Sequence, residues 1–188
     1  MGSTPTYSSN CNASRFSGGP TSILAVDVQY EGDVSAQVAG IVITDWPDTR
    51  VIESHSFTKH GIEPYVPGEF YKRELPCIMD LLARLKTQPS IIIVDGYVDC
   101  GVDHPGLGRH LFDALSGRVP VIGVAKTAFF GAPHVEVIHG HTSIKPVFVT
   151  AAGIDIDVAV DGIKRMAGSY RIPDLLKSVD GLARGHHG

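Results

Sequence analysis

Short apolar stretches separated by polar connections dominate the first two thirds of the chain. They are rich in Val and Ile and bounded by turn-forming residues, as buried β-strands are. These runs lie at 22–30, 36–44, 90–95, 119–125 and 146–151. The segment 50–58 instead alternates polar and apolar positions, which predicts a half-exposed strand joined to the first two by short connections.

Three other segments carry apolar residues at helical spacing. They lie at 68–86, 107–115 and 155–166. Pro76 falls inside the first segment and predicts a kink or a break there. Asp155 precedes the third and is suited to cap its N-terminus.

The order of these elements predicts the fold class. Three meander strands are followed by alternating helices and strands, so we expect an α/β protein with a mixed sheet covered by helices on both faces. The ribonuclease H-like architecture has this order, with the first strand central and paired with the strand after the first helix. We expect one such domain over 21–185, preceded by a flexible polar leader over 1–20.

Composition narrows the class of protein without identifying it. Hydrophobic content of 43% and charged content of 19% are typical of a globular protein. No apolar stretch approaches the roughly 18 residues that a membrane helix needs, so we expect no membrane partner. Cys11, Cys77 and Cys100 lack metal-binding spacing and fit free thiols in the cytoplasm. A net charge of −4 means that nucleic acid could be attracted only by a local basic patch; a monomer is expected.

Three acidic residues are candidates for a metal site. Asp27 ends the run ILAVD, Asp95 ends IIIVD, and Glu74 lies between them in PYVPGEFYKRE. Carboxylates at the tips of two adjacent strands could share one Mg²⁺ or Mn²⁺ ion, which would activate water and stabilise charge at phosphorus. Each residue also has an ordinary interpretation: a strand-end aspartate, an Asp-Gly turn and a solvated helix residue.

A stiff loop precedes Glu74. Two prolines flank Tyr65 and Val66 in the segment 63–68. Such a loop could insert a side chain between bases, as wedges do in nucleic-acid enzymes. On local sequence alone, a packed loop with its tyrosine over the core is slightly favoured.

Basic and histidine side chains near the predicted strand ends are further candidates. Lys126 follows the run VIGVA and could bind a phosphate, balance nearby negative charge or be an ordinary surface lysine. His104 could contact a phosphate oxygen or move a proton, although a solvated loop histidine is the commoner case. We expect His134, His139 and His141 to lie at the surface. Dinucleotide, ATP and serine-hydrolase motifs are missing from the sequence.

A set of motifs resembles the endonuclease V family in order and spacing. They are AVDVQY, PYVPGEFYKRE, IIIVDGY, HPGLG, PVIGVAK and GSYRIP, and the similarity as a whole covers roughly Ile23 to Arg184. The resemblance implies a ribonuclease H-like fold and an Mg²⁺-dependent endonuclease that recognises deaminated adenine, as inosine, in DNA or RNA. It also implies cleavage at the second phosphodiester 3′ to the lesion.

The resemblance also implies roles for particular residues. Asp27, Glu74 and Asp95 match the metal-binding carboxylates, and Lys126 matches a lysine that contacts phosphate near the cut. The stretch from Pro64 through Tyr65 and Val66 to Pro67 matches the strand-separating wedge. Gly68, Phe70 and Gly96 match positions that form the base pocket, and His104 matches a loop histidine.

One departure from the family bears on activity. The family carries a histidine in a Gly-His-Arg stretch after the last strand, whereas 151–155 here reads AAGID. Asp155 could supply a fourth acidic group instead. The departure leaves two alternatives to an inosine endonuclease: a protein that binds inosine or nucleic acid with impaired catalysis, and a structure-specific nuclease of the same fold.

Overall fold

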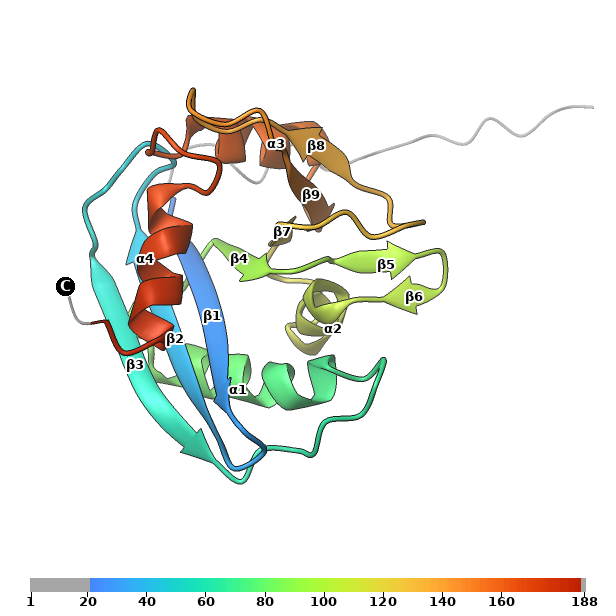
Figure 1. The fold of residues 1–188 in the computed structure, drawn as a ribbon. Coiled ribbons are helices and arrows are strands. Elements are labelled where there is room, and N and C mark those ends of the chain that lie inside the picture. The colour runs from blue at the N-terminus through green and yellow to red at the C-terminus, as the bar shows by residue number, and fades with distance from the viewer. Residues whose placement is uncertain (1–20, 187–188) are drawn as a thin grey trace, which may run out of the picture.

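A seven-stranded mixed sheet forms the centre of the molecule in a computed structural model that describes residues 21–186 (Figure 1). From one edge to the other, its strands are β3 (Glu53–His60), β2 (Ser35–Ile43), β1 (Ile23–Glu31), β4 (Ile91–Asp95), β7 (Val121–Ala125), β9 (Val147–Ala152) and β8 (Val135–Val137). The predicted mixed sheet is therefore confirmed. The predicted leader, 1–20, lies outside the described residues.

The sheet combines an antiparallel half with a parallel centre. β1, β2 and β3 form an antiparallel meander, whereas β1 pairs with β4 and β4 with β7 in parallel. β9 then runs antiparallel to β7. The first strand is thus internal and paired with the strand that follows the first helix, as expected.

Helices cover both faces of this sheet. On one face, α1 (Tyr71–Arg84) and α2 (Leu107–Ala114) pack against residues such as Leu24, Val26 and Ile92. On the other, α3 (Ile156–Arg165) and α4 (Asp174–Ala183) pack against the alternate set, which includes Ile23, Ala25 and Ile93. Side chains alternate between faces along a strand, which produces these two apolar layers from nearly continuous apolar runs.

Several elements differ from the sequence predictions. The helix α1 continues without a break from Tyr71 through Pro76 to Arg84. The short hairpin of β5 (Asp99–Gly101) and β6 (His104–Pro105), the edge strand β8 and the helix α4 were not predicted. Strands of two or three residues carry little hydrophobic pattern, which explains why β5 and β6, which form a separate two-stranded sheet, and the edge strand β8 escaped prediction.

The expectation that three histidines lie at the surface is wrong for His139. Its ring is 2% exposed, and its two nitrogens lie 2.6 Å and 2.9 Å from the carbonyl oxygens of Tyr170 and Met166. The polar loop that carries it folds against the segment between α3 and α4, which buries the imidazole. His134 is half-buried against Phe148, and His141 is exposed as expected.

Two remaining expectations concern cysteines and membranes. Cys77 and Cys100 are free thiols, while Cys11 lies outside the described residues. Within residues 21–186, no helix has the length and apolar character needed to cross a bilayer.

Candidate active site

Asp27 and Asp95 lie next to each other at the centre of the sheet. The parallel register of β1 and β4 pairs Val26 with Val94, so the two aspartates are the next residues on their strands. Both continue the alternate set that faces α3 and α4. Asp27 does not end its strand as predicted, because β1 continues to Glu31 in its pairing with β2. Asp27 lies level with Asp95, the last residue of β4, and β1 continues beyond that position.

Two glycines allow the backbone to turn sharply after β4. Gly96 follows Asp95 with φ at +138°, a conformation that side chains rarely adopt. A Cβ atom on Gly123 of β7 would lie 2.5 Å from the carbonyl oxygen of Gly96. Only glycine at 123 therefore leaves room for this turn, which fixes the position of the Asp95 backbone.

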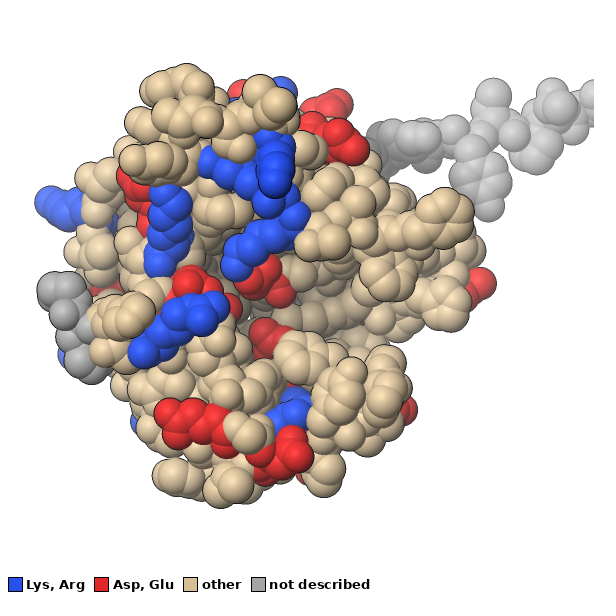
Figure 2. Space-filling model, in the orientation of Figure 1, with Lys and Arg blue, Asp and Glu red and all other residues tan. Residues whose placement is uncertain are grey.

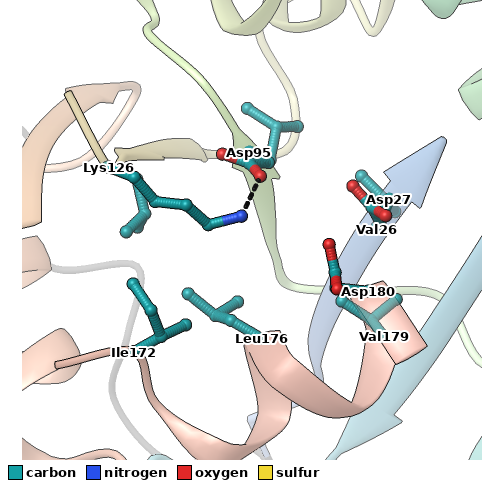
Figure 3. Close-up of a pocket in the computed structure, with 10 residues that line it drawn as sticks. Val26, Asp27, Asp95, Lys126, Ile172, Leu176, Val179 and Asp180 are labelled. Atoms are coloured by element: carbon teal, nitrogen blue, oxygen red, sulfur yellow. Dashed lines mark hydrogen bonds and ion pairs between the residues drawn. The ribbon is translucent and has the colours of Figure 1, made fainter. Parts of the chain in front are cut away.

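Lys126 extends from the end of β7 to Asp95. Its Nζ donates to Oδ2 of Asp95 at 2.8 Å, and both side chains remain close to half-exposed (Figure 3). The sequence left three roles open for Lys126. This contact corresponds to one of them, in which the lysine balances nearby negative charge. The hydrogen bond and the charge of Asp95 raise the pKa of Lys126 against the opposing effect of burial, which is the largest single influence. The amine is therefore protonated at neutral pH.

Glu74 approaches the aspartates from the opposite face of the sheet. It lies in the first turn of α1 and is buried, and its carboxylate has no hydrogen-bond partner in the described part of the chain. Burial, followed by the negative charges of Asp27 and Asp95, raises the pKa of Glu74 to about 8. A carboxyl group in this environment is neutral or strained as an anion unless a cation comes close.

Asp27 is a second buried carboxylate. Its Oδ2 accepts a hydrogen bond from Nε2 of Gln29 at 2.9 Å. Burial raises the pKa of Asp27, and the charges of Asp95 and Asp180 raise it further, while the Gln29 hydrogen bond opposes them. Acidic groups from two strands and two helices thus influence one another electrostatically.

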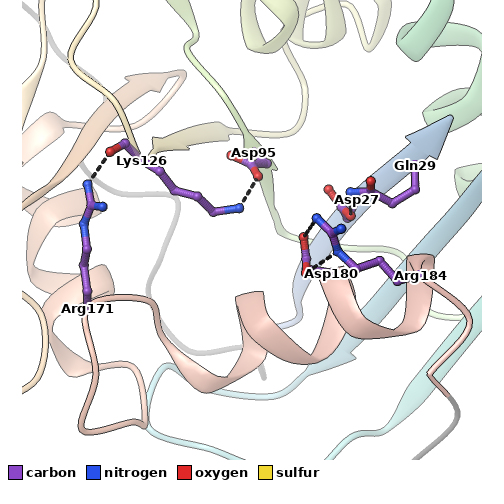
Figure 4. Close-up of polar contacts among 7 residues, drawn as sticks. All are labelled: Asp27, Gln29, Asp95, Lys126, Arg171, Asp180 and Arg184. Atoms are coloured by element: carbon purple, nitrogen blue, oxygen red, sulfur yellow. Dashed lines mark hydrogen bonds and ion pairs between the residues drawn. The ribbon is translucent and has the colours of Figure 1, made fainter.

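The acidic group added by the structure is Asp180, on α4. Asp180 lines a pocket together with Asp27, Asp95 and Lys126, and its side chain points toward the strand ends (Figure 3). Arg184, one turn later, donates to both of its oxygens at 2.8 Å and 3.1 Å (Figure 4). Sequence reasoning missed this residue because α4 itself was not predicted.

Asp155 is used differently from the fourth acidic group that was expected. Its carboxylate accepts the backbone N–H of Asp157 at 2.8 Å and caps the N-terminus of α3. The prediction of an N-cap is therefore confirmed, and this hydrogen bond engages the carboxylate at the start of the helix.

Basic side chains lie along one side of the recess that holds the carboxylates. Figure 2 shows acidic side chains within a recess and Lys and Arg side chains gathered along one side of it. Arg171 contributes to the local structure by donating to the carbonyl oxygen of Lys126 (Figure 4). It also donates to the carbonyl oxygen of Pro146. A chain with a net negative charge thus has a local basic region next to its carboxylates, which suits a polyanionic ligand.

The carboxylate groups of the pocket are suited to a hard divalent cation, although their side chains do not form a compact cluster. Among residues 21–186, no three Asp, Glu, His or Cys side chains are gathered tightly enough to form a metal centre. The available donors are carboxylate oxygens, which suit Mg²⁺ and Mn²⁺. Asp95 contacts Lys126 and Asp180 contacts Arg184. The buried Glu74 has no Lys or Arg partner in the described part of the chain. An unpaired buried carboxylate beside two aspartates is an observation that a bound cation would explain.

The proline-flanked loop does not place its tyrosine over the core. Tyr65 is 55% exposed, and its ring contacts Phe70 edge-on at 6.5 Å between centroids. Phe70 in turn packs edge-on against Tyr30 at 5.5 Å. Two aromatic contacts therefore connect the exposed tip of the loop to β1, while Val66 beside the tip is also exposed. This geometry therefore argues against a packed loop with its tyrosine over the core.

An open cleft lies beside this loop. It has a volume of about 850 Å³ and is lined on one wall by Gly68, Glu69 and Tyr71. His104 lines it as well, so the loop histidine and the glycine expected in the base pocket share one cavity. His110 of α2 stacks on Tyr71 at 3.5 Å between centroids.

Comparison with known proteins decides the family. The family model described as Endonuclease V matches residues 8–141. The chain belongs to the endonuclease V family. Members of this family are metal-dependent nucleases, hydrolases that act on phosphodiester bonds.

Individual relatives extend over most of the chain. Endonuclease V of Nostoc sp. is 31% identical over 185 residues, covering 86% of this chain and 81% of its own. The relative from Streptomyces avermitilis is 32% identical, with 86% and 79% covered. Its crystal structure superposes with a TM-score of 0.69 at 29% identity, over 89% and 81% of the two chains.

More distant structures share the fold. An endonuclease V from Ciona intestinalis, crystallised with a 24mer DNA containing an inosine followed by a ribo-adenosine, has a TM-score of 0.71 at 20% identity. That match covers 88% of this chain and 85% of the other. The mixed sheet with flanking helices is therefore the architecture of solved endonuclease V structures.

Proposed function

We propose that this chain is an Mg²⁺-dependent endonuclease that cleaves nucleic acid at inosine, at the second phosphodiester 3′ to the lesion, with Mn²⁺ as an alternative ion. The family membership supports the nuclease activity, and the inosine-containing DNA bound to the Ciona relative supports the lesion. The observation that carries the metal assignment is the buried, unpaired Glu74 beside Asp27 and Asp95.

Asp27, Glu74 and Asp95 would hold the cation. When bound, the ion supplies Lewis acidity at the scissile phosphate and lowers the pKa of a water. Asp95 and Asp27 come from rigid, adjacent strands, which favours a fixed geometry, and Glu74 comes from the first turn of a buried helix. Asp180 would add negative charge from α4.

Lys126 would act on the substrate phosphate. Its amine is protonated and close to half-exposed at the mouth of the pocket. There it can neutralise charge that grows on the phosphate oxygens, and its hydrogen bond to Asp95 keeps it in place before the substrate arrives.

Lesion recognition would use the loop and cleft beside the carboxylates. Tyr65, with Val66 and Pro67 directly after it, would occupy the space of the extruded base and separate the strands. Backbone groups at Gly68 and Gly96, with the ring of Phe70, would surround the inosine base. His104 would contact a phosphate at the opposite rim.

The decisive assay uses four substrates: DNA and RNA oligonucleotides, each with or without one inosine. We expect cleavage only of inosine substrates, and only with Mg²⁺ or Mn²⁺. Tight inosine-preferring binding without cleavage would identify a catalytically impaired binding protein instead. Strong cleavage of undamaged strands would identify a structure-specific nuclease.

Two further properties complete the proposal. A monomer acting in the cytoplasm fits free thiols at Cys77 and Cys100. Sedimentation and fractionation of tagged protein test these two properties directly.

A further inference from the structure

Two apolar side chains stand out from the surface of the cleft. Phe130 is 102% exposed and Val102 is 87% exposed, so neither side chain is covered by the rest of the described chain. Exposing a whole phenylalanine ring to water is unfavourable, and a fully exposed aromatic residue on a cleft rim suggests a ligand that covers it.

The two side chains belong to one wall of the cleft. Val102 is at the turn of the β5–β6 hairpin, and Phe130 is in the loop between β7 and β8 (Figure 1). A Cβ atom on Gly101 would lie 3.7 Å from the carbonyl oxygen of Gly131, so the hairpin and the loop are in contact. We call Val102 and Phe130 the apolar rim. It faces the wall formed by Gly68, Glu69 and Tyr71.

The apolar rim is attached to the candidate active site through Tyr97. The hydroxyl of Tyr97 donates to the carbonyl oxygen of Thr127 at 2.8 Å and accepts the backbone N–H of Phe129 at 3.0 Å. Tyr97 follows Asp95 by two residues, and Thr127 directly follows Lys126. The loop that presents Phe130 is therefore held at both the β4 and β7 strand ends.

We propose that Phe130, supported by Val102, stacks against an unpaired nucleobase of the substrate strand next to the lesion. This inference rests on the proposed function and names the form of the substrate: a strand opened locally rather than an intact duplex. Every base has a flat π-face, so an aromatic ring binds unpaired bases without regard to sequence. The loop that carries the exposed Tyr65 continues into Gly68, which lines the same cleft. Tyr65 would supply the unpaired base by separating the strands.

Nucleic acid is favoured over a protein as the occupant because the loop that presents Phe130 begins at Lys126, which lines the candidate active site. The same loop carries Lys126 at its start and Phe130 near its middle. A ligand that reaches the carboxylates therefore passes close to the apolar rim.

The test measures oligonucleotide binding by wild type, Phe130→Ala and Phe130→Trp, in Ca²⁺ to suppress turnover. We expect Phe130→Ala to weaken binding of an inosine-containing single strand about 5- to 10-fold, in the lower range for loss of a base–aromatic stack. Phe130→Trp should restore affinity. Ile144→Ala, at a position that is 92% exposed in another loop, is the matched control and should bind as wild type does.

A spectroscopic readout separates stacking from general loss of structure. Trp46, the one tryptophan of the sequence, is buried against α3. The fluorescence added by Phe130→Trp should be quenched when oligonucleotide binds, whereas that of wild type should change little. Unquenched fluorescence at saturating oligonucleotide would overturn the proposal.

The outcomes also separate this inference from the proposed function. Wild type that neither binds nor cuts inosine substrates would remove both. Active wild type with an equally tight Phe130→Ala variant would overturn the stacking role alone. A Phe130→Ala variant that loses self-association in sedimentation but keeps its oligonucleotide affinity would assign the apolar rim to a second copy of the chain.

Discussion

The pocket at the strand ends and the open cleft beside it are built in opposite ways. In the pocket, Asp27 is buried and its neighbour Asp95 is fixed by sheet register and by the Gly96 turn. In the cleft and beside it, exposed side chains such as Phe130 and Tyr65 are carried by loops. Chemistry at phosphorus requires charges held in place, whereas recognition of a base tolerates a more adaptable surface.

The electrostatics of the two regions differ as well. Beside the pocket, burial and then the negative charges of Asp27 and Asp95 raise the pKa of Glu74 to about 8. The cleft rim is aromatic and aliphatic. Variants in the pocket should therefore abolish catalysis while leaving nucleic-acid binding largely intact, and variants in the cleft should do the reverse.

The largest effect is expected for Asp95→Ala. Loss of a carboxylate that we propose as a ligand of the cation should lower single-turnover cleavage of an inosine oligonucleotide by about 100- to 1,000-fold. Binding should change little, because Lys126 is freed to contact phosphate. Asp161→Asn, at a surface position on α3, is the control. Full activity of Asp95→Ala would show that cleavage does not depend on this carboxylate.

Lys126→Ala should lower cleavage by about 10- to 100-fold. The variant removes the amine at the pocket mouth and leaves Asp95 without its 2.8 Å partner. Because the competing ammonium is gone, affinity for Mn²⁺, measured by calorimetry, should rise. A variant with unchanged cleavage and unchanged Mn²⁺ affinity would show that the lysine is an ordinary surface residue.

Glu74→Gln should stabilise the metal-free protein by about 4 kcal/mol at pH 8, an effect visible in urea unfolding. The folded-state pKa of Glu74 lies above its ordinary value of 4.5, so the folded chain binds more protons between these values. Stability of the metal-free wild type should therefore fall as pH rises from about 5 to 8.

In the glutamine variant that fall should be smaller, and at pH 5 the two proteins should be nearly equally stable. Divalent cation should stabilise wild type more than the variant. If the stability of Glu74→Gln fell more steeply with pH than that of wild type, the pKa of Glu74 would not be raised in the folded protein.

The smallest effect is expected for Tyr65→Ala. Loss of the exposed ring should weaken binding of inosine duplexes about 5- to 10-fold and of single strands less, because only the duplex requires separation. Tyr170→Ala, an exposed tyrosine outside the cleft, is the control. Equal losses on both substrates would assign Tyr65 to general contact instead of strand separation.

Much of the fold follows from local pattern. The apolar runs locate β1, β2, β4, β7 and β9 within a few residues, and the order of elements placed Asp27 beside Asp95. Sheet register makes this possible, since adjacent parallel strands bring equivalent positions together.

The parts that escaped prediction depend on tertiary contacts. Leu175, Leu176 and Val179 have helical spacing, but only the packing of α4 against β1 and β2 brings Asp180 to the pocket. His139 looked like a surface residue in a polar loop, and its burial depends on carbonyl groups 27 and 31 residues away. Contacts of this kind leave no periodic signal in the sequence.

The most direct test of the metal assignment is the anomalous scattering of Mn²⁺ in crystals of the wild-type protein. We expect one strong peak at the centre of the sheet, within coordination distance of oxygens from Asp27, Glu74 and Asp95, and no such peak in Glu74→Gln. Mn²⁺ bound elsewhere, or bound at that place without Glu74, would contradict it.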